Sequence, residues 1–211
     1  MSNKPQDVTY WQNRKLNDDE RDWGYKDENW VKDYVKSADH PHRQVIIDFL
    51  KTFDWSYLLE LGSSSGPNLI RIHEAFPTAA LFAIEANSDS VEEAKRVLPV
   101  AVDVQVGDMN KTLPFADGYF DVVLADASLM YIDPENINKV MDEISRVARK
   151  SVIIVERFAE TDEITGHVWG RNYTKLLAGR GFHVKEVPVT KELWPTSINW
   201  QKYGKFFLAT R

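Results

Sequence analysis

The amino-acid sequence predicts an α/β fold, in which a largely parallel β-sheet is covered by helices on both faces. From residue 55 onward, short apolar runs alternate with segments of helical periodicity, a pattern typical of consecutive βαβ units. The apolar runs are nearly continuous, as expected for strands buried on both faces. The last two runs, over 182–189 and 205–209, have no helical pattern between them. We therefore expect them to complete the sheet as an antiparallel pair.

The other elements are expected in a regular order along the chain. Strands are predicted over 56–61, 81–85, 102–106, 120–125 and 151–156, and helices over 67–76, 89–98, 134–150 and 169–178. Pro67 suits the first turn of its helix because its φ is already fixed and no N–H is needed there. Ser88 is expected to cap the next helix. The long connection over 190–204 carries Trp194 and Trp200 and is a candidate binding loop.

The N-terminal segment differs in composition from the rest. Residues 1–45 are rich in charged and aromatic side chains but poor in aliphatic ones, so they cannot form a core of their own. Trp30, Tyr34 and Ser37 share one helical face. We expect an aromatic-rich helical cap that packs on the main domain, residues 46–211, either as simple packing or as a lid over a ligand site.

Composition and charge indicate which kinds of partner the protein is expected to bind. The formal net charge of −6 disfavours nucleic acid, because affinity for phosphates comes from clustered Lys and Arg. No apolar run approaches the length of about 18 residues that suggests a membrane span, and the first residues contain no signal core. We expect a cytoplasmic protein without a membrane partner. No metal is expected, because cysteine is absent and His40 and His42 have no third ligand nearby.

The chain is organised around the segment 57–68, where an apolar strand leads through a Gly-Ser loop into a helix. Such a loop directs backbone N–H groups and the positive end of a helix dipole at a ligand. The dinucleotide fingerprint Gly-x-Gly-x-x-Gly is not met, because Ser64 occupies the position of the middle glycine. A phosphate loop is excluded as well, because Pro67 rather than lysine follows Gly66.

One interpretation of this loop is a serine hydrolase. Residues 62–66 match Gly-x-Ser-x-Gly with Ser64 as nucleophile, and Asp126 with His167 or His183 satisfies the chain order of a triad. Against it, no oxyanion loop of the His-Gly-Gly type precedes the loop, and no other strand precedes the strand that leads into it. A non-catalytic nucleoside-binding module is a second alternative.

Acidic residues at successive strand ends favour a different ligand. Glu60 lies beside the loop, and Glu85, Asp108 and Asp126 end or follow the next three strands. Strand ends of a parallel sheet meet at one edge, where ligands bind near the switch point. Glu85 could accept hydrogen bonds from both hydroxyls of a ribose. Asp108 could accept one from an adenine amine, beside the thioether of Met109, and Asp126 could accept one from an ammonium group. Each of these acidic residues therefore has a use if the ligand is a nucleoside that carries an amino acid.

The same segments resemble the successive motifs of class I S-adenosylmethionine (SAM)-dependent methyltransferases. They are Glu-Leu-Gly-Ser-Ser-Ser-Gly at 60–66, Ala-Ile-Glu-Ala-Asn at 83–87, Val-Gly-Asp-Met at 106–109 and Phe-Asp-Val-Val-Leu-Ala-Asp at 120–126. The resemblance spans about residues 45–211. It implies a Rossmann-like seven-stranded sheet of order 3-2-1-4-5-7-6, with strand seven antiparallel, and SAM as cofactor. Segments 30–43 and 66–69 resemble a subset of small bacterial and phage methyltransferases.

The resemblance also implies a set of cofactor-binding residues. They are Tyr34, Arg43, Glu60, Gly62, Ser63, Ser64, Gly66, Asn68, Glu85, Ala86, Asp108, Met109, Asp126 and Ala127. Among them, Arg43 and Asn68 would meet the methionine carboxylate. Ser64 departs from the glycine of the family motif and adds a hydroxyl donor.

Methyl transfer from a sulfonium is an in-line displacement that requires alignment and exclusion of water. If a base is needed, His167 is the preferred candidate and Tyr131 the second. Arg171 is a candidate for binding an acidic acceptor. The aromatic residues of the cap and of the loop over 190–204 favour a small-molecule acceptor over a macromolecular one, and a protein or nucleic-acid acceptor is the less favoured alternative.

Overall fold

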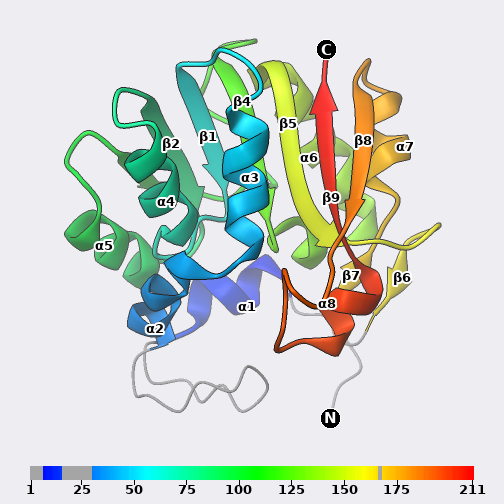
Figure 1. Cartoon of the computed structure of the whole chain (residues 1–211), viewed down its shortest axis with the longest axis horizontal. Coiled ribbons are helices and arrows are strands. Elements are labelled where there is room, and N and C mark those ends of the chain that lie inside the picture. Colours follow the sequence, from blue (N-terminus) through cyan, green and yellow to red (C-terminus); the bar gives the residue numbers. More distant parts are fainter. Residues whose placement is uncertain (1–6, 16–29, 166–167) are drawn as a thin grey trace.

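The main sheet has the order predicted from the sequence. The computed structural model describes residues 7–15, 30–165 and 168–211. Seven strands lie in the order β3-β2-β1-β4-β5-β9-β8 (Figure 1). They are β1 (Tyr57–Leu61), β2 (Ala80–Glu85), β3 (Asp103–Val106), β4 (Phe120–Asp126), β5 (Ala148–Arg157), β8 (His183–Pro188) and β9 (Gly204–Thr210). β1 to β5 pair in parallel, whereas β9 is antiparallel to both β5 and β8. The predicted antiparallel seventh strand is therefore confirmed as β9.

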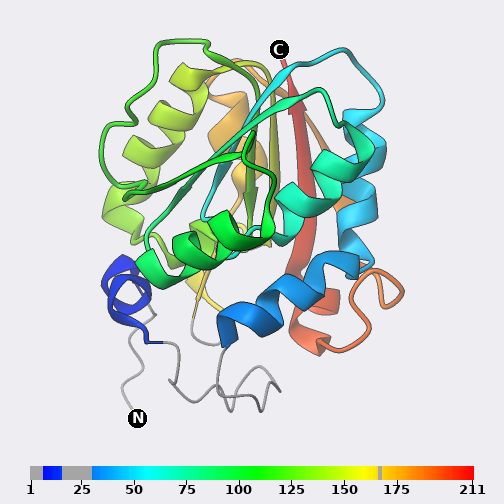
Figure 2. The same ribbon diagram turned by 90° about the vertical axis from the view of Figure 1, so that its left-hand side faces the viewer.

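Helices cover both faces of the sheet (Figures 1 and 2). The helices are α1 (Val8–Asn13), α2 (Trp30–Lys36), α3 (His42–Leu50), α4 (Pro67–Ala75), α5 (Ser88–Val97), α6 (Pro134–Val147), α7 (Tyr173–Ala178) and α8 (Ile198–Tyr203). Short 3-10 turns form η1 (Ser37–Asp39) and η2 (Leu129–Tyr131), and β6 (Glu163–Ile164) pairs with β7 (Trp169–Gly170) outside the main sheet. α3, α4 and α5 pack on one face, and α6 and α7 pack on the other.

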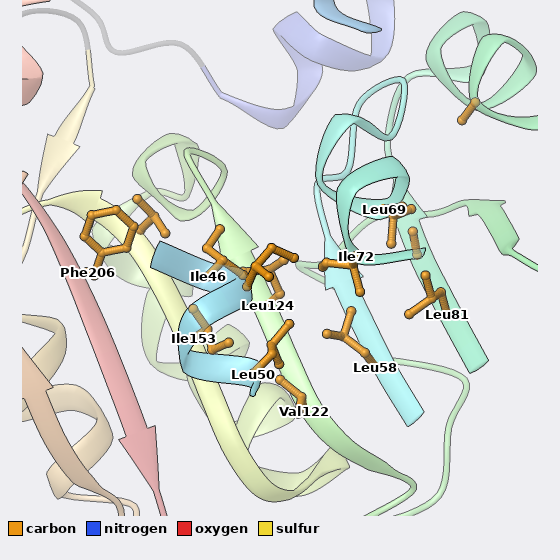
Figure 3. Packing of buried hydrophobic residues seen from close by; sticks show 14 of the residues in the cluster. Ile46, Leu50, Leu58, Leu69, Ile72, Leu81, Val122, Leu124, Ile153 and Phe206 are labelled. Carbon is orange, nitrogen blue, oxygen red and sulfur yellow. The ribbon is translucent and has the colours of Figure 1, made fainter. Parts of the chain in front are cut away.

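The central strand β4 supplies both hydrophobic cores, because successive side chains of a strand point to opposite faces. Val122 and Leu124 pack with Ile46 and Leu50 of α3 (Figure 3). Val123 belongs to the cluster that α6 and α7 cover. Every residue of β4 is buried, in agreement with its apolar run over 122–125, and the strand ends at the acidic Asp126.

Several local predictions were wrong. The predicted helix over 169–178 begins only at Tyr173, because Trp169–Gly170 pairs with Glu163–Ile164 as a short hairpin. The cap of α5 is Asn87 rather than Ser88, since the Asn87 side chain accepts from the N–H of Ser90.

Other elements differ in extent from their predictions. The connection over 190–204 contains α8, which Ser197 caps. The expected boundary at residue 45 falls inside α3, and the residues of this helix in the core, Ile46, Ile47 and Leu50, lie on its main-domain side. In the described part of the chain, no helix is long and apolar enough to cross a membrane.

Leu124→Ala is predicted to destabilise the protein by about 2–5 kcal/mol, because it leaves a cavity in a fully buried position. Urea unfolding followed by circular dichroism measures this change. Val106→Ala is the matched control, because Val106 is 58% exposed. A loss for Leu124→Ala no larger than that of the control would contradict the prediction.

Candidate functional site

A cavity of about 330 Å³ lies at the carboxyl ends of β1 to β5. It begins near Gly107 and Met109 after β3, passes Gly62 after β1 and Asp126 at the end of β4, and reaches Arg157 at the end of β5. Residues of α1, α2 and the segment over 194–200 form its other walls. The cavity therefore follows the edge where ligands bind in open parallel sheets.

The loop after β1 owes its shape to residues with positive φ. Gly62 has a φ of 77°, and a Cβ there would lie 2.5 Å from the Cβ of Ser128. Gly66, with a φ of 83°, precedes Pro67, which begins α4 as predicted. Ser64 also has a positive φ, of 48°, and such a backbone is uncommon for a residue other than glycine. The loop thus combines a close approach to β4 with an immediate helix start.

Glu85 connects this loop to β2. Its carboxylate accepts from the backbone N–H of Ser64 at 2.8 Å and from that of Asn87 at 2.8 Å. Burial raises the pKa of Glu85, and the backbone hydrogen bonds oppose that shift. Because each carboxylate oxygen can accept a further hydrogen bond, Glu85 is positioned to bind ligand hydroxyls in the cavity.

Asp126 is the centre of a buried polar network. Its Oδ2 accepts from Nη1 of Arg43 at 3.1 Å and from Nδ2 of Asn68 at 3.0 Å, and it lies 2.8 Å from Nε2 of His42. The Asn68 amide also donates to Glu60 at 2.7 Å. The network joins β4 to α3, α4 and β1.

The charges of this network follow from burial and pairing. Burial raises the pKa of Glu60 to about 8. Burial opposes ionisation of Asp126 as well, but His42, Arg43 and Asn68 hold its pKa well below the usual range. Burial lowers the pKa of His42 and brings that of His40 to about 4. At neutral pH, Asp126 is therefore the ionised carboxylate of the network, and both imidazoles are neutral.

The turn after β4 depends on Glu156, which the sequence analysis missed. Its Oε1 accepts from the N–H of Ser128 at 2.7 Å and of Leu129 at 2.6 Å, and burial raises the pKa of Glu156 to about 8. Arg171 donates to the carbonyls of Leu129 and Ile132. Arg171 is fully buried outside the cavity wall, so its expected role in binding an acceptor is not supported.

Hydrogen bonds connect the N-terminal segment, which contains α1 and α2, to the edge of the sheet where the cavity lies. The Asn87 side chain donates to the carbonyls of Trp11 and Arg14 at 2.8 and 2.9 Å. The hydroxyl of Ser65 donates to the carbonyl of Val31 at 2.9 Å. The Trp11 ring lies 5.0 Å from that of Tyr131. These contacts hold α1 and α2 at the cavity, whose wall includes Trp11 and Trp30.

The predicted site residues fall into three groups. Those that line the cavity are Tyr34, Arg43, Gly62, Ser64, Glu85, Ala86, Met109, Asp126, Ala127 and Tyr131. Those that lie beside it without lining it are Glu60, Ser63, Gly66, Asn68 and Asp108, whose Oδ1 accepts from the N–H of Asn110. His167 lies outside the described residues.

The geometry gives no support to the serine-hydrolase interpretation. The Ser64 hydroxyl has no hydrogen-bond partner among the described residues. His183 begins β8, which runs parallel to β5, so it lies at the opposite end of the sheet from the cavity. His42 lines the cavity, but its nitrogens lie within hydrogen-bond distance of Asp126 and of His40.

The sheet order is that of the Rossmann-like methyltransferase fold. A family model described as a methyltransferase domain matches residues 58–151, from β1 into β5. The family model identifies residues 58–151 as a methyltransferase domain, and the fold agrees with that of SAM-dependent methyltransferases. Among curated proteins, no sequence matches.

Solved structures share the fold at low sequence identity. Magnesium protoporphyrin IX methyltransferase from Synechocystis PCC 6803, solved with bound SAM, is 15% identical with a TM-score of 0.68, covering 97% of this chain and 94% of that chain. A SAM-dependent methyltransferase from Mesorhizobium loti is 12% identical with a TM-score of 0.63, covering 82% and 100%. One from Aquifex aeolicus is 16% identical with a TM-score of 0.62, covering 88% and 99%.

Glu156→Gln is predicted to flatten the dependence of stability on pH. The pKa of Glu156 rises from 4.5 to about 8 on folding, so between these values the folded protein holds a proton that the unfolded chain has lost. This stabilising contribution is complete below pH 4.5 and is lost as the pH rises to about 8. Urea unfolding at several pH values should show that the free energy of unfolding of the wild type falls, relative to that of the variant, as the pH increases.

The exposed carboxylate of Glu160, with 68% of its side chain accessible, provides the control Glu160→Gln. If the free energy of unfolding depends on pH in the same way for the wild type and Glu156→Gln, the pKa of Glu156 is not raised on folding and the prediction is wrong.

Proposed function

We propose that the protein transfers the methyl group of SAM to a small-molecule acceptor by in-line displacement. The observation that carries this proposal is that predicted cofactor residues from neighbouring strands line one cavity of about 330 Å³. That volume is at the lower end of the usual range for small-molecule sites. The net charge of −6 argues in the same direction, against a nucleic-acid acceptor.

In this proposal the donor lies along the ends of β3, β2, β1 and β4. Glu85 accepts the ribose hydroxyls, and Met109 packs on the adenine. Arg43 and Asn68 act near the methionine carboxylate, and the region of Asp126 receives the ammonium group. The placement is supported by the order of these residues along the cavity and by the buried network that holds them.

The proposed reaction depends mainly on alignment of the acceptor with the methyl group and the sulfur, and on exclusion of water. Burial raises the pKa of Tyr131 well above 10, so its phenol stays neutral and acts as a hydrogen-bond donor rather than as a base. His167 stays a prediction as a base. We further propose that residues 1–45 form the cap that closes the donor site, which the contacts of Asn87 and Ser65 support.

Glu85→Gln is predicted to weaken the binding of S-adenosylhomocysteine (SAH) by about tenfold or more, because hydrogen bonds to a charged group contribute about 1.5–3 kcal/mol. Isothermal titration calorimetry measures the dissociation constant, and thermal melting confirms that the variant folds. Glu92→Gln, on the exposed face of α5, is the matched control. Unchanged SAH affinity in a folded Glu85→Gln protein would remove Glu85 from the proposed ribose site.

A further inference from the structure

Arg157 is a buried cation in the cavity wall. It ends β5 and is 3% exposed. Its Nη1 donates to the carbonyl of Thr165, while its Nε has no hydrogen-bond partner in the described ranges. Within those ranges it forms no ion pair. A buried guanidinium without an anionic partner is costly, so its presence beside a ligand cavity requires an explanation.

The neighbours of Arg157 do not neutralise it. Burial raises the pKa of Glu156, the nearest carboxylate in sequence, to about 8, and its oxygen is bound by backbone N–H groups of the turn after β4. Tyr131 is a neutral phenol at physiological pH. Trp200 contributes a ring whose centroid is 5.9 Å from the guanidinium carbon, which stabilises a cation without removing its charge.

The other arginines of the cavity wall have different surroundings. Arg43 pairs with Asp126 at 3.1 Å. Arg14 lies against the aromatic rings of the cap, 4.0 Å from the Trp30 centroid. Arg157 is thus a cavity arginine that has neither the carboxylate partner of Arg43 nor the aromatic surroundings of Arg14.

The position of Arg157 places it beyond the donor. In the strand order, three spacings separate β2, which carries Glu85, from β5, and at about 4.8 Å each these amount to about 14 Å. The donor in the proposed function occupies the edge from β3 to β4. The cavity continues past it to Arg157, where Trp194, Ser197 and Trp200 complete the wall.

We propose that Arg157 binds a carboxylate of the methyl acceptor, and that the substrate is therefore a small organic acid with an apolar body. This inference rests on the proposed function. A carboxylate matches a guanidinium in charge and in the spacing of its two oxygens. The indole rings beside Arg157 supply an apolar wall for the rest of the molecule. The carboxylate anchors the acceptor and is distinct from the methionine carboxylate of the donor.

Matched pairs of small probes test this proposal. The pairs are benzoate and benzamide, 4-hydroxybenzoate and 4-hydroxybenzamide, and indole-3-acetate and indole-3-acetamide, with phenyl phosphate as a different anion. Dissociation constants are measured by NMR titration at saturating SAH. We expect at least one acid to bind about tenfold more tightly than its amide, since a charge-assisted hydrogen bond is lost in the amide.

Variants test whether Arg157 causes the preference for the acid over the amide. Arg157→Gln should remove the preference for the acid while leaving SAH affinity within about twofold, and Arg157→Lys should retain part of it. Lys202→Gln, which removes an exposed cation of α8 outside the cavity wall, should leave the preference unchanged. Melting curves establish that each variant is folded.

Several results would overturn the proposal. They are equal binding of acids and amides, absence of binding by every acid, tighter binding of phenyl phosphate than of the acids, and an acid preference that survives Arg157→Gln. Loss of SAH affinity in folded Arg157→Gln would assign the residue to the donor instead. Failure of the wild type to bind SAH would count against the proposed function, and the acid preference measured without SAH would then still test Arg157.

Discussion

The ionised carboxylate of Asp126 is the interaction on which the arrangement of the site depends. A buried charge is tolerated only when it is paired and hydrogen-bonded, and the partners of Asp126 come from different elements. Arg43 and His42 belong to α3, whereas Asn68 belongs to the first turn of α4. Because α4 begins directly after the loop that follows β1, the same charge fixes that loop, the end of β4 and the helix that leads into the main domain.

The sequence predicted the sheet better than its surroundings, for a physical reason. Parallel strands buried on both faces are mostly apolar, so β4 is recognisable from its apolar run over 122–125. The hairpin of β6 and β7 pairs only two residues on each side, which leaves no periodic pattern, and the spacing after Trp169 fits a helix equally well. Asn87 and Ser88 are both good caps, and only the direction of the Asn87 side chain decides between them.

The sequence analysis looked for acidic residues at the carboxyl ends of the strands, and this search found part of the candidate site. Glu60, Glu85 and Asp126 all lie at or beside the cavity, but the rule was not extended to the fifth strand, which ends in Glu156 and Arg157. Arg171 was a candidate for the acceptor because it is a cation in a loop. Its donors instead satisfy backbone carbonyls of the turn after β4, a use of charge that no local pattern reveals.

The loop around Ser64 shows why a motif can match without its function. Gly-x-Ser-x-Gly describes a requirement for a tight turn between a strand and a helix, and a nucleophile elbow and a ligand-binding loop share that requirement. What separates them is the surroundings of the serine. The Ser64 N–H donates to Glu85, and the Ser64 hydroxyl has no hydrogen-bond partner among the described residues. A nucleophile needs a base aligned with its hydroxyl, whereas a cofactor loop needs backbone donors, a close approach and a carboxylate beside it. Among the described residues the loop meets the second set of conditions and not the first, in agreement with the proposed function.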